Sequence, residues 1–257
     1  MNVVTLTECV TRFSEAGIAS GDTVVVHASL KTVGWISGGA NTILDALLQV
    51  VGPQGTIVVS AQYPENADPA LMNRSVDPRA ANLLRQSQPP FRGKSTLLSG
   101  MGALTTVVQL DERSKVSDHP ALAVAAIGKQ AKWITSEHPL SPAFGPQSPL
   151  AKVVELGAKA LLIGVDYTTL SVLHLAQVQA NTLPWVIHTH SVGSPERPQT
   201  VQSLDYAYTT EGFNAIGEAY ARLAPVQTGR LGRAPLLVVD CATLIPFAKT
   251  WLERTSA

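Results

Sequence analysis

Residues 23–60 constrain the fold more than any other part of the chain. Residues 23–28 form a valine-rich run, residues 40–51 carry apolar side chains at helical spacing, and residues 56–60 form a second apolar run. Two buried strands joined by a helix make a βαβ unit, whose strands are parallel and whose crossover is right-handed. The segment therefore predicts an α/β fold.

The same alternation of apolar runs and helical patterns continues along the chain. We expect helices near residues 5–17, 40–51, 79–87, 101–110, 128–135, 169–180, 211–223 and 242–253, a further helix start at Ser148-Pro149, and strands near residues 23–28, 56–60, 122–127, 159–165, 184–189 and 235–240. No repeat or linker interrupts this pattern. We therefore predict a single domain over residues 1–257, with a central mixed, largely parallel sheet flanked by helices and a loop-rich excursion at about 62–100.

Composition narrows the class of protein. Hydrophobic residues make up 45% of the chain, which excludes a disordered protein, and 19 basic residues balance 19 acidic ones, which gives no electrostatic reason to expect nucleic acid or an anionic membrane as partner. Cys9 and Cys241 lie too far apart in sequence for a CxxC pair or a disulfide framework. With no signal-peptide pattern and no apolar run of membrane-spanning length, we expect a cytoplasmic location.

His27 stands at the carboxyl end of the first predicted strand. Ligands of open α/β sheets bind outside the carboxyl ends of strands, and the Gly38-Gly39 pair that follows lets a ligand approach the backbone. The loop has neither the GK[ST] of a Walker motif nor a GxGxxG fingerprint. A turn without any ligand remains an equally valid interpretation of this segment.

Ser171, His174 and Gln177 recur at helical spacing after the apolar run 159–165, so they share one face of a predicted helix. This places polar groups where reactive side chains usually lie, although a hydrogen-bonded, half-buried histidine fits the same pattern. His188 and His190 point to one face of a strand, but no third ligand lies at metal-binding spacing, so we predict no metal site. Cys9 and Cys241 fit packed positions better than nucleophilic ones.

Five segments together resemble the aminoglycoside 3-N-acetyltransferase family, also called the antibiotic N-acetyltransferase family. They are VVVHASLKTVGWISGGANTILDALLQVVGPQGTIVV, GMGAL, VSDHPALAVAAIG, SPAFGPQSPLAKVVELGAKALLIGVDYTTLSVLHLAQ and FNAIGEAYARLAPVQTGRLGRAPLLVVDCATLIPFA. They occur in the family's order and span nearly the whole chain.

The resemblance implies a fold distinct from that of the GNAT acetyltransferases. It also implies transfer of an acetyl group from acetyl-CoA to the 3-amino group of the deoxystreptamine ring of aminoglycosides, without a metal, and it suggests a homodimer. By position in the motifs, His174 would be the general base, with Ser171 where the family usually has threonine. The residues that would bind CoA are His27, Ser29, Leu30, Lys31, Thr32, Val33, Gly34, Ser117 and His119.

The chain departs from the family pattern at several positions. Ala28, Val116 and Ala123 replace Ser, Arg and Ser of the family motifs, and Gly212 replaces a recurrent Asp. Gln177 replaces a glutamate that would help to bind the cationic drug.

These departures bear on the substrate more than on the reaction. An acyltransferase of the same family that acts on a different amine therefore remains an alternative. A non-catalytic CoA-binding module and a metal hydrolase that uses His27, His119 and His174 are further alternatives.

An amine attacks a thioester only after losing its proton, and a histidine with a pKa near 6.5 accepts that proton at neutral pH. We expect His174 to do so, while Ser171 or a backbone N–H stabilises the oxyanion. No cysteine is placed to carry the acyl group, so direct transfer is favoured. Because a polycation requires nearby carboxylates, we expect Glu65, Asp68 and Asp166 to contact it, beside Gln177.

Overall fold

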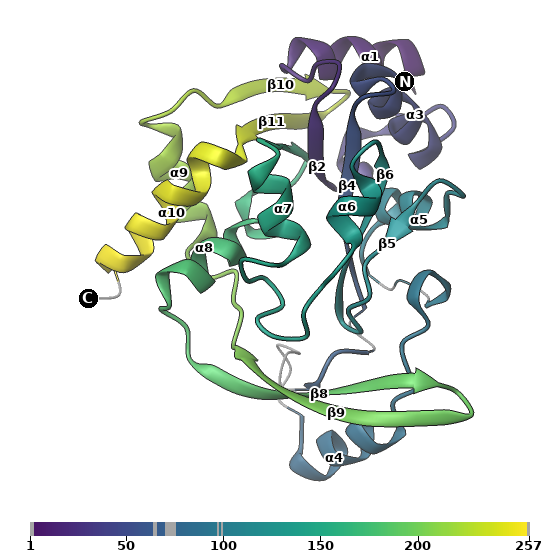
Figure 1. Ribbon diagram of the computed structural model, residues 1–257. Helices are drawn as coiled ribbons and strands as arrows, with labels where there is room; N and C mark the ends of the chain where they lie inside the picture. The colour runs from purple at the N-terminus through teal and green to yellow at the C-terminus, as the bar shows by residue number, and fades with distance from the viewer. Residues whose placement is uncertain (1–2, 64–65, 70–75, 97, 99, 256–257) are drawn as a thin grey trace.

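The structure, a computed structural model, describes residues 3–63, 66–69, 76–96, 98 and 100–255 (Figure 1). In this part of the chain a seven-stranded sheet has the order β10-β11-β7-β2-β4-β6-β5. Its strands are β2 (Thr23–Ala28), β4 (Thr56–Gln62), β5 (Lys115–Val116), β6 (Leu122–Gly128), β7 (Lys159–Ile163), β10 (Gln227–Leu231) and β11 (Ala234–Asp240). Two small sheets pair β1 (Val3–Val4) with β3 (Trp35–Ile36), and β8 (Trp185–Ser194) with β9 (Arg197–Tyr206).

The prediction of a mixed sheet is confirmed, but the parallel part is smaller than expected. Within the seven-stranded sheet, only β2 with β4 and β2 with β7 pair in parallel, whereas the four outer pairings are antiparallel. The sequence misleads here because β6 and β11 are as apolar as the central strands. Burial on both faces, rather than parallel pairing, explains that composition.

Helices cover both faces of the seven-stranded sheet (Figure 1). The helices α1 (Leu6–Glu15), α3 (Ala40–Val51) and α5 (Ala103–Leu110) pack on one face, where Val24 and Val26 of β2 point. The helices α6 (Ala131–Thr135), α7 (Pro149–Glu155), α8 (Leu173–Ala180), α9 (Phe213–Ala221) and α10 (Cys241–Thr255) pack on the other, with Val25. Because successive side chains of β2 point to opposite faces, the strand contributes to two separate hydrophobic cores.

The two central strands separate at their carboxyl ends. The ladder between β2 and β4 stops at Val25 opposite Val58, although both strands continue. Beyond that point β2 stays paired with β7 as far as Ala28, and β4 stays paired with β6 as far as Gln62. The sheet thus opens a crevice between its two central strands, which is the position where α/β sheets bind ligands.

The hairpin of β8 and β9 lies outside the main sheet, and α4 (Pro78–Ser87) packs near it (Figure 1). The sequence predicted a strand at 184–189 but missed β9 and β10. Most of β9 is exposed and polar, so it lacks the apolar run by which a buried strand is recognised. The remaining short helices are α2 (Leu30–Val33), η3 (Gly93–Ser95) and η4 (Tyr167–Thr169). No helix among the described residues is long and apolar enough to cross a membrane.

Candidate active site

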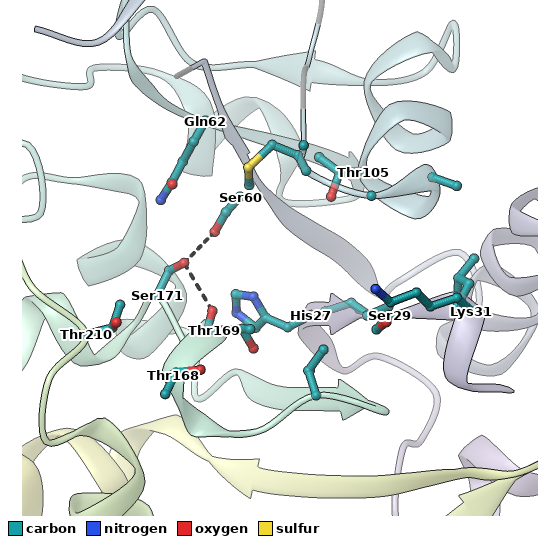
Figure 2. A pocket seen from close by; sticks show the side chains of 18 of the residues that line it. His27, Ser29, Lys31, Ser60, Gln62, Thr105, Thr168, Thr169, Ser171 and Thr210 are labelled. Carbon is teal, nitrogen blue, oxygen red and sulfur yellow. Dashed lines mark hydrogen bonds between the residues drawn. The ribbon is translucent and has the colours of Figure 1, made fainter. Parts of the chain in front are cut away.

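A cavity of about 640 Å³ occupies the crevice between β2 and β4 (Figure 2). Its lining comes from residues 26–31 in β2 and the turn after it, Ser60 and Gln62 of β4, residues 100–103 and 105, residues 165, 168, 169, 171 and 174 around η4 and α8, and Thr210. His27 and His174 therefore face one space, although they are 147 positions apart along the chain (174 − 27). Both sides of the predicted site lie at a single cavity.

The turn that leaves β7 brings the second side of the site close to the first. Gly164 has a φ of +63°, and a Cβ at this position would lie 1.8 Å from Thr32 Oγ1. Only glycine fits this close approach, because the backbone conformation is left-handed and the space is filled. The chain then enters η4, whose Asp166 accepts a hydrogen bond from the Thr168 N–H at 3.0 Å.

Ser171 lies in the turn between η4 and α8, not on the helix, because α8 begins at Leu173. The expected continuous helix over 169–180 is therefore wrong at its start. Ser171 still faces the cavity, and its Oγ accepts a hydrogen bond from Ser60 Oγ at 2.9 Å (Figure 2). Leaving the helix frees the serine from helical spacing and lets it reach β4.

The imidazole of His174 is held among aromatic rings. Phe144 stacks on it at 4.9 Å with an interplanar angle of 9°, while Tyr208 and Phe213 lie at 5.4 and 5.0 Å. Burial lowers the pKa of His174 from 6.5 to about 4. The expected pKa near 6.5 is therefore replaced by a lower one, and the ring is neutral throughout the physiological range.

Gln177 fixes the tautomer of His174. Its Nε2 donates to the carbonyl oxygen of Thr209 at 2.8 Å, so its Oε1 is left to face the ring, 2.8 Å from His174 Nδ1. An amide oxygen only accepts, hence Nδ1 carries the proton and Nε2 carries the lone pair. Gln177 is buried and is not part of the cavity lining, so the expected contact with substrate does not fit its position.

His27 reaches the cavity from the end of β2 (Figure 2). Its Nε2 is buried and has no hydrogen-bond partner in the part of the chain that the structure describes. Burial, followed by the nearby His174, lowers the pKa of His27 to about 4. Ser29, Leu30 and Lys31 continue the same wall of the cavity. Of the other residues expected to bind CoA, Thr32, Val33 and Gly34 lie behind this wall: Thr32 donates to the Ser29 carbonyl and Val33 is in the apolar core.

Ser117 and His119 do not reach the cavity, contrary to the expectation that they bind CoA. Both are fully buried. Ser117 Oγ accepts from the Val124 N–H at 2.9 Å and contacts His138 Nδ1 at 2.8 Å, while His119 Nδ1 accepts from the Ala121 and Leu122 N–H groups. These bonds close the loop before β6, and a contact of either residue with CoA stays a prediction.

Asp68 and Asp166, two of the expected carboxylate ligands, are not in the cavity lining either. Asp68 is fully buried and forms a two-pronged ion pair with Arg85, at 3.0 and 2.9 Å, while it also accepts from the Thr189 N–H. The Asp68 carboxylate is thus neutralised by Arg85 and links residues 62–100 to β8. A buried carboxylate with these partners is not positioned to contact a substrate. Asp166 is exposed and bonded to Thr168 and Asn214, and Glu65 lies outside the described residues.

Replacing Asp68 by asparagine is expected to lower the free energy of unfolding by about 2 kcal/mol, because the Thr189 N–H and the partly exposed Arg85 guanidinium lose a charged hydrogen-bond acceptor. The KM for any acceptor should stay unchanged. Urea unfolding measures the first quantity and steady-state kinetics the second. Asp111→Asn is the matched control: its ion pair with Arg113 is at the surface, so a loss below about 1 kcal/mol is expected. A raised KM with unchanged stability would contradict this structural role for Asp68.

Several lining residues escaped the sequence analysis, namely Ser60, Gln62, Thr105, Thr168, Thr169 and Thr210. Ser60 and Gln62 had a recognisable signal, since they end a strand beside the one that carries His27. The threonines had none, because threonine is common in loops. Cys9 and Cys241 are buried, and burial raises their pKa values to about 11 and about 12, so packed positions are confirmed. Among the described residues no three His, Cys, Asp or Glu side chains are grouped to hold a metal ion.

Comparison with known proteins identifies the family. The family model of aminoglycoside 3-N-acetyltransferases matches residues 25–253. The chain belongs to this family. The aminoglycoside N(3)-acetyltransferase III of Salmonella sp. is 31% identical over 256 residues, which cover 93% of this chain and 87% of that protein.

Solved structures of acetyltransferases agree with this assignment to the family. AAC-IIIb, solved as a binary complex with CoASH, is 29% identical with a TM-score of 0.86, covering 99% of this chain and 98% of that one. AAC-VIa bound to sisomicin is 26% identical with a TM-score of 0.85, covering 99% of both chains. The predicted family, the mixed α/β fold and the assignment to the acyltransferases are therefore confirmed.

Proposed function

We propose that the protein transfers the acetyl group of acetyl-CoA directly to the 3-amino group of an aminoglycoside. One observation carries the proposal: the lone-pair nitrogen of a neutral His174 and the strand end at His27 belong to the same cavity. A base and two substrate-binding walls around one space are what a ternary complex requires. Membership of the family supports the choice of both substrates.

The thioester arm would enter along the β2 wall, past Ser29, Leu30 and Lys31. Lys31 is exposed and positively charged, which suits the phosphates of CoA outside the cavity. CoASH in the complex with AAC-IIIb supports CoA as the co-substrate. The turn at Thr32, Val33 and Gly34 then serves to hold this wall in place.

The acceptor would approach from the side of η4 and α9. A second hollow of about 610 Å³ shares Thr168 and Thr210 with the cavity and adds Glu211 and Asn214. Glu211 supplies a carboxylate and the threonines supply hydroxyls, which match the amino and hydroxyl groups of an aminosugar. Asp166, bonded to both Thr168 and Asn214, adds negative charge behind this hollow.

In the transfer step, the lone pair of the acceptor nitrogen forms a bond to the thioester carbon, and the carbonyl π pair moves to oxygen. His174 Nε2 takes the proton that the nitrogen loses, while Ser171 Oγ donates a hydrogen bond to the oxyanion. The intermediate then reforms the carbonyl and breaks the C–S bond. The leaving thiolate receives the proton from His174, so no acyl-enzyme forms and the histidine returns to its starting state.

A different amine is a second candidate acceptor, which one observation favours. Among the described residues, those that line the main cavity include no carboxylate, and Gln177 is neutral where the family motif has glutamate. Such a lining suits an acceptor with fewer positive charges than an aminoglycoside carries.

Mass spectrometry of the acceptor after incubation with acetyl-CoA tests the proposal. We expect one acetyl group on a kanamycin- or gentamicin-class drug, released CoA in equal amount, and fragment ions that place the group on the 3-amino nitrogen. Monoamino sugars and simple polyamines run in parallel. Acetylation of one of these with none of the drugs would establish the second candidate, and CoA binding without turnover would exclude both.

A further inference from the structure

Ser60 places a hydroxyl on a strand whose neighbours are apolar. It lies on β4 beyond the point where β4 leaves β2, and it is 93% buried (100% − 7%). Val59 and Ala61 point to the core formed with α3 and α5, whereas Val58 belongs to the core on the opposite face. Because side chains alternate along a strand, Ser60 shares the face of Val58, on the side from which Ser171 and His174 come.

Among the described residues, Ser171 is the hydrogen-bond partner of the Ser60 hydroxyl. Ser60 Oγ donates to Ser171 Oγ at 2.9 Å across 111 positions of sequence (Figure 2). The Ser171 oxygen is thereby engaged as an acceptor. Ser171 Oγ in turn donates to the Thr169 carbonyl at 3.5 Å, a distance at which a hydrogen bond is weak. The Ser171 proton is therefore available to a ligand in the cavity that both serines line.

From this geometry we infer that Ser60 is a positioning residue, which orients the Ser171 hydroxyl toward the oxygen of the bound thioester. The inference rests on the proposed function, in which Ser171 donates to the oxyanion. Ser60 makes Ser171 a better hydrogen-bond donor in two ways. The bond from Ser60 holds the Ser171 side chain in place beside the end of β4. It also polarises the Ser171 hydroxyl, because a hydroxyl that accepts a hydrogen bond donates its own more strongly. Ser60 does not itself touch the reacting atoms.

A double-mutant cycle tests the role of Ser60. Ser60→Ala should lower kcat about tenfold, a fraction of the ~10²–10³-fold cost of removing an oxyanion donor outright, with the KM for acetyl-CoA unchanged. Ser171→Ala should cost more. In the Ser171→Ala background, the Ser60→Ala change should alter kcat by less than about twofold, since nothing is left to orient. Ser60→Thr keeps the hydroxyl and suits a strand, so it should restore most of kcat.

Two further measurements test the role of Ser60 separately from the proposed function. Slow hydrolysis of acetyl-CoA without any amine uses the same oxyanion donor, so the cycle is repeated on that reaction. Ser191→Ala, a buried strand serine of β8 outside the cavity lining, is the matched control and should leave kcat unchanged.

The outcomes distinguish the two proposals. If the wild-type protein is active and Ser60→Ala keeps full kcat, the role of Ser60 is wrong while the proposed function stands. The same conclusion holds if Ser60→Ala lowers kcat by the same factor with and without Ser171. A wild-type protein that binds acetyl-CoA but neither transfers nor hydrolyses the acetyl group overturns the proposed function and the role of Ser60 with it.

Discussion

Replacing His174 by alanine is expected to lower kcat for acetyl transfer by ~10²–10⁴-fold, the usual contribution of a general base. The free protein should still bind acetyl-CoA, because the β2 wall of the cavity is unchanged. Burial lowers the pKa of the His174 imidazole to about 4, so the wild-type ring is unprotonated at neutral pH. Loss of activity from protonation of this ring should consequently appear only below about pH 5, well under the ordinary histidine range.

Steady-state kinetics of His174→Ala between pH 5 and 9 checks this expectation. His188→Ala is the matched control, because His188 is equally buried but lies in the β8–β9 hairpin away from the cavity. Circular dichroism and acetyl-CoA binding by calorimetry establish that each variant is folded. A kcat within threefold of wild type would show that another group takes the proton.

The second large effect is a loss of stability in weak acid. Burial lowers the pKa values of His27, His138, His174 and His190 to about 4 and lowers that of His119 well below its ordinary value. The unfolded chain binds these protons near pH 6.5, so between pH 6.5 and 4 it holds more protons than the folded protein. Stability is therefore present above pH 6.5 and falls as the pH drops toward 4.

Each of these four histidines contributes about 3 kcal/mol to this loss once the pH has fallen to about 4, since one pKa unit corresponds to about 1.4 kcal/mol. Together they approach the whole stability of an ordinary domain, about 5–15 kcal/mol. We expect the melting temperature to fall steeply between pH 6.5 and 5, with proton uptake on unfolding. His138→Asn should reduce that uptake by about one proton at pH 5.5. A melting temperature that is the same at pH 7 and pH 5 would contradict the prediction.

The sequence predicted those parts of the site that follow from local rules. A strand of valines ending in His27 predicted a ligand at the strand end, and a cavity lies there. The spacing of Ser171 and His174 predicted a shared helix face; both residues line the cavity, although Ser171 lies outside the helix. These inferences depend only on where strands end and how helices repeat. The extent of the single domain and the assembly into a dimer stay predictions.

Long-range packing supplies what local rules cannot. Asp68 is a carboxylate, which is the kind of side chain expected to bind a cationic drug. Only the tertiary structure shows that Arg85 and Thr189 already bind this carboxylate. Likewise the motif at Ser117 and His119 is recognisable in sequence, while its burial and the contact of His119 with His190 of β8 are not. The bond between Ser60 and Ser171 joins two segments that no periodicity relates.

The separation of β2 from β4 has a consequence for how such a protein changes. One wall is anchored through β7 and the other through β6, so each is held by its own neighbour. Residues at the tip of β4, such as Gln62, can be exchanged without shifting the register of the strand that carries His27. A substitution of Gln62 should therefore change the shape of the cavity while the strand that carries His27 keeps its position through β7.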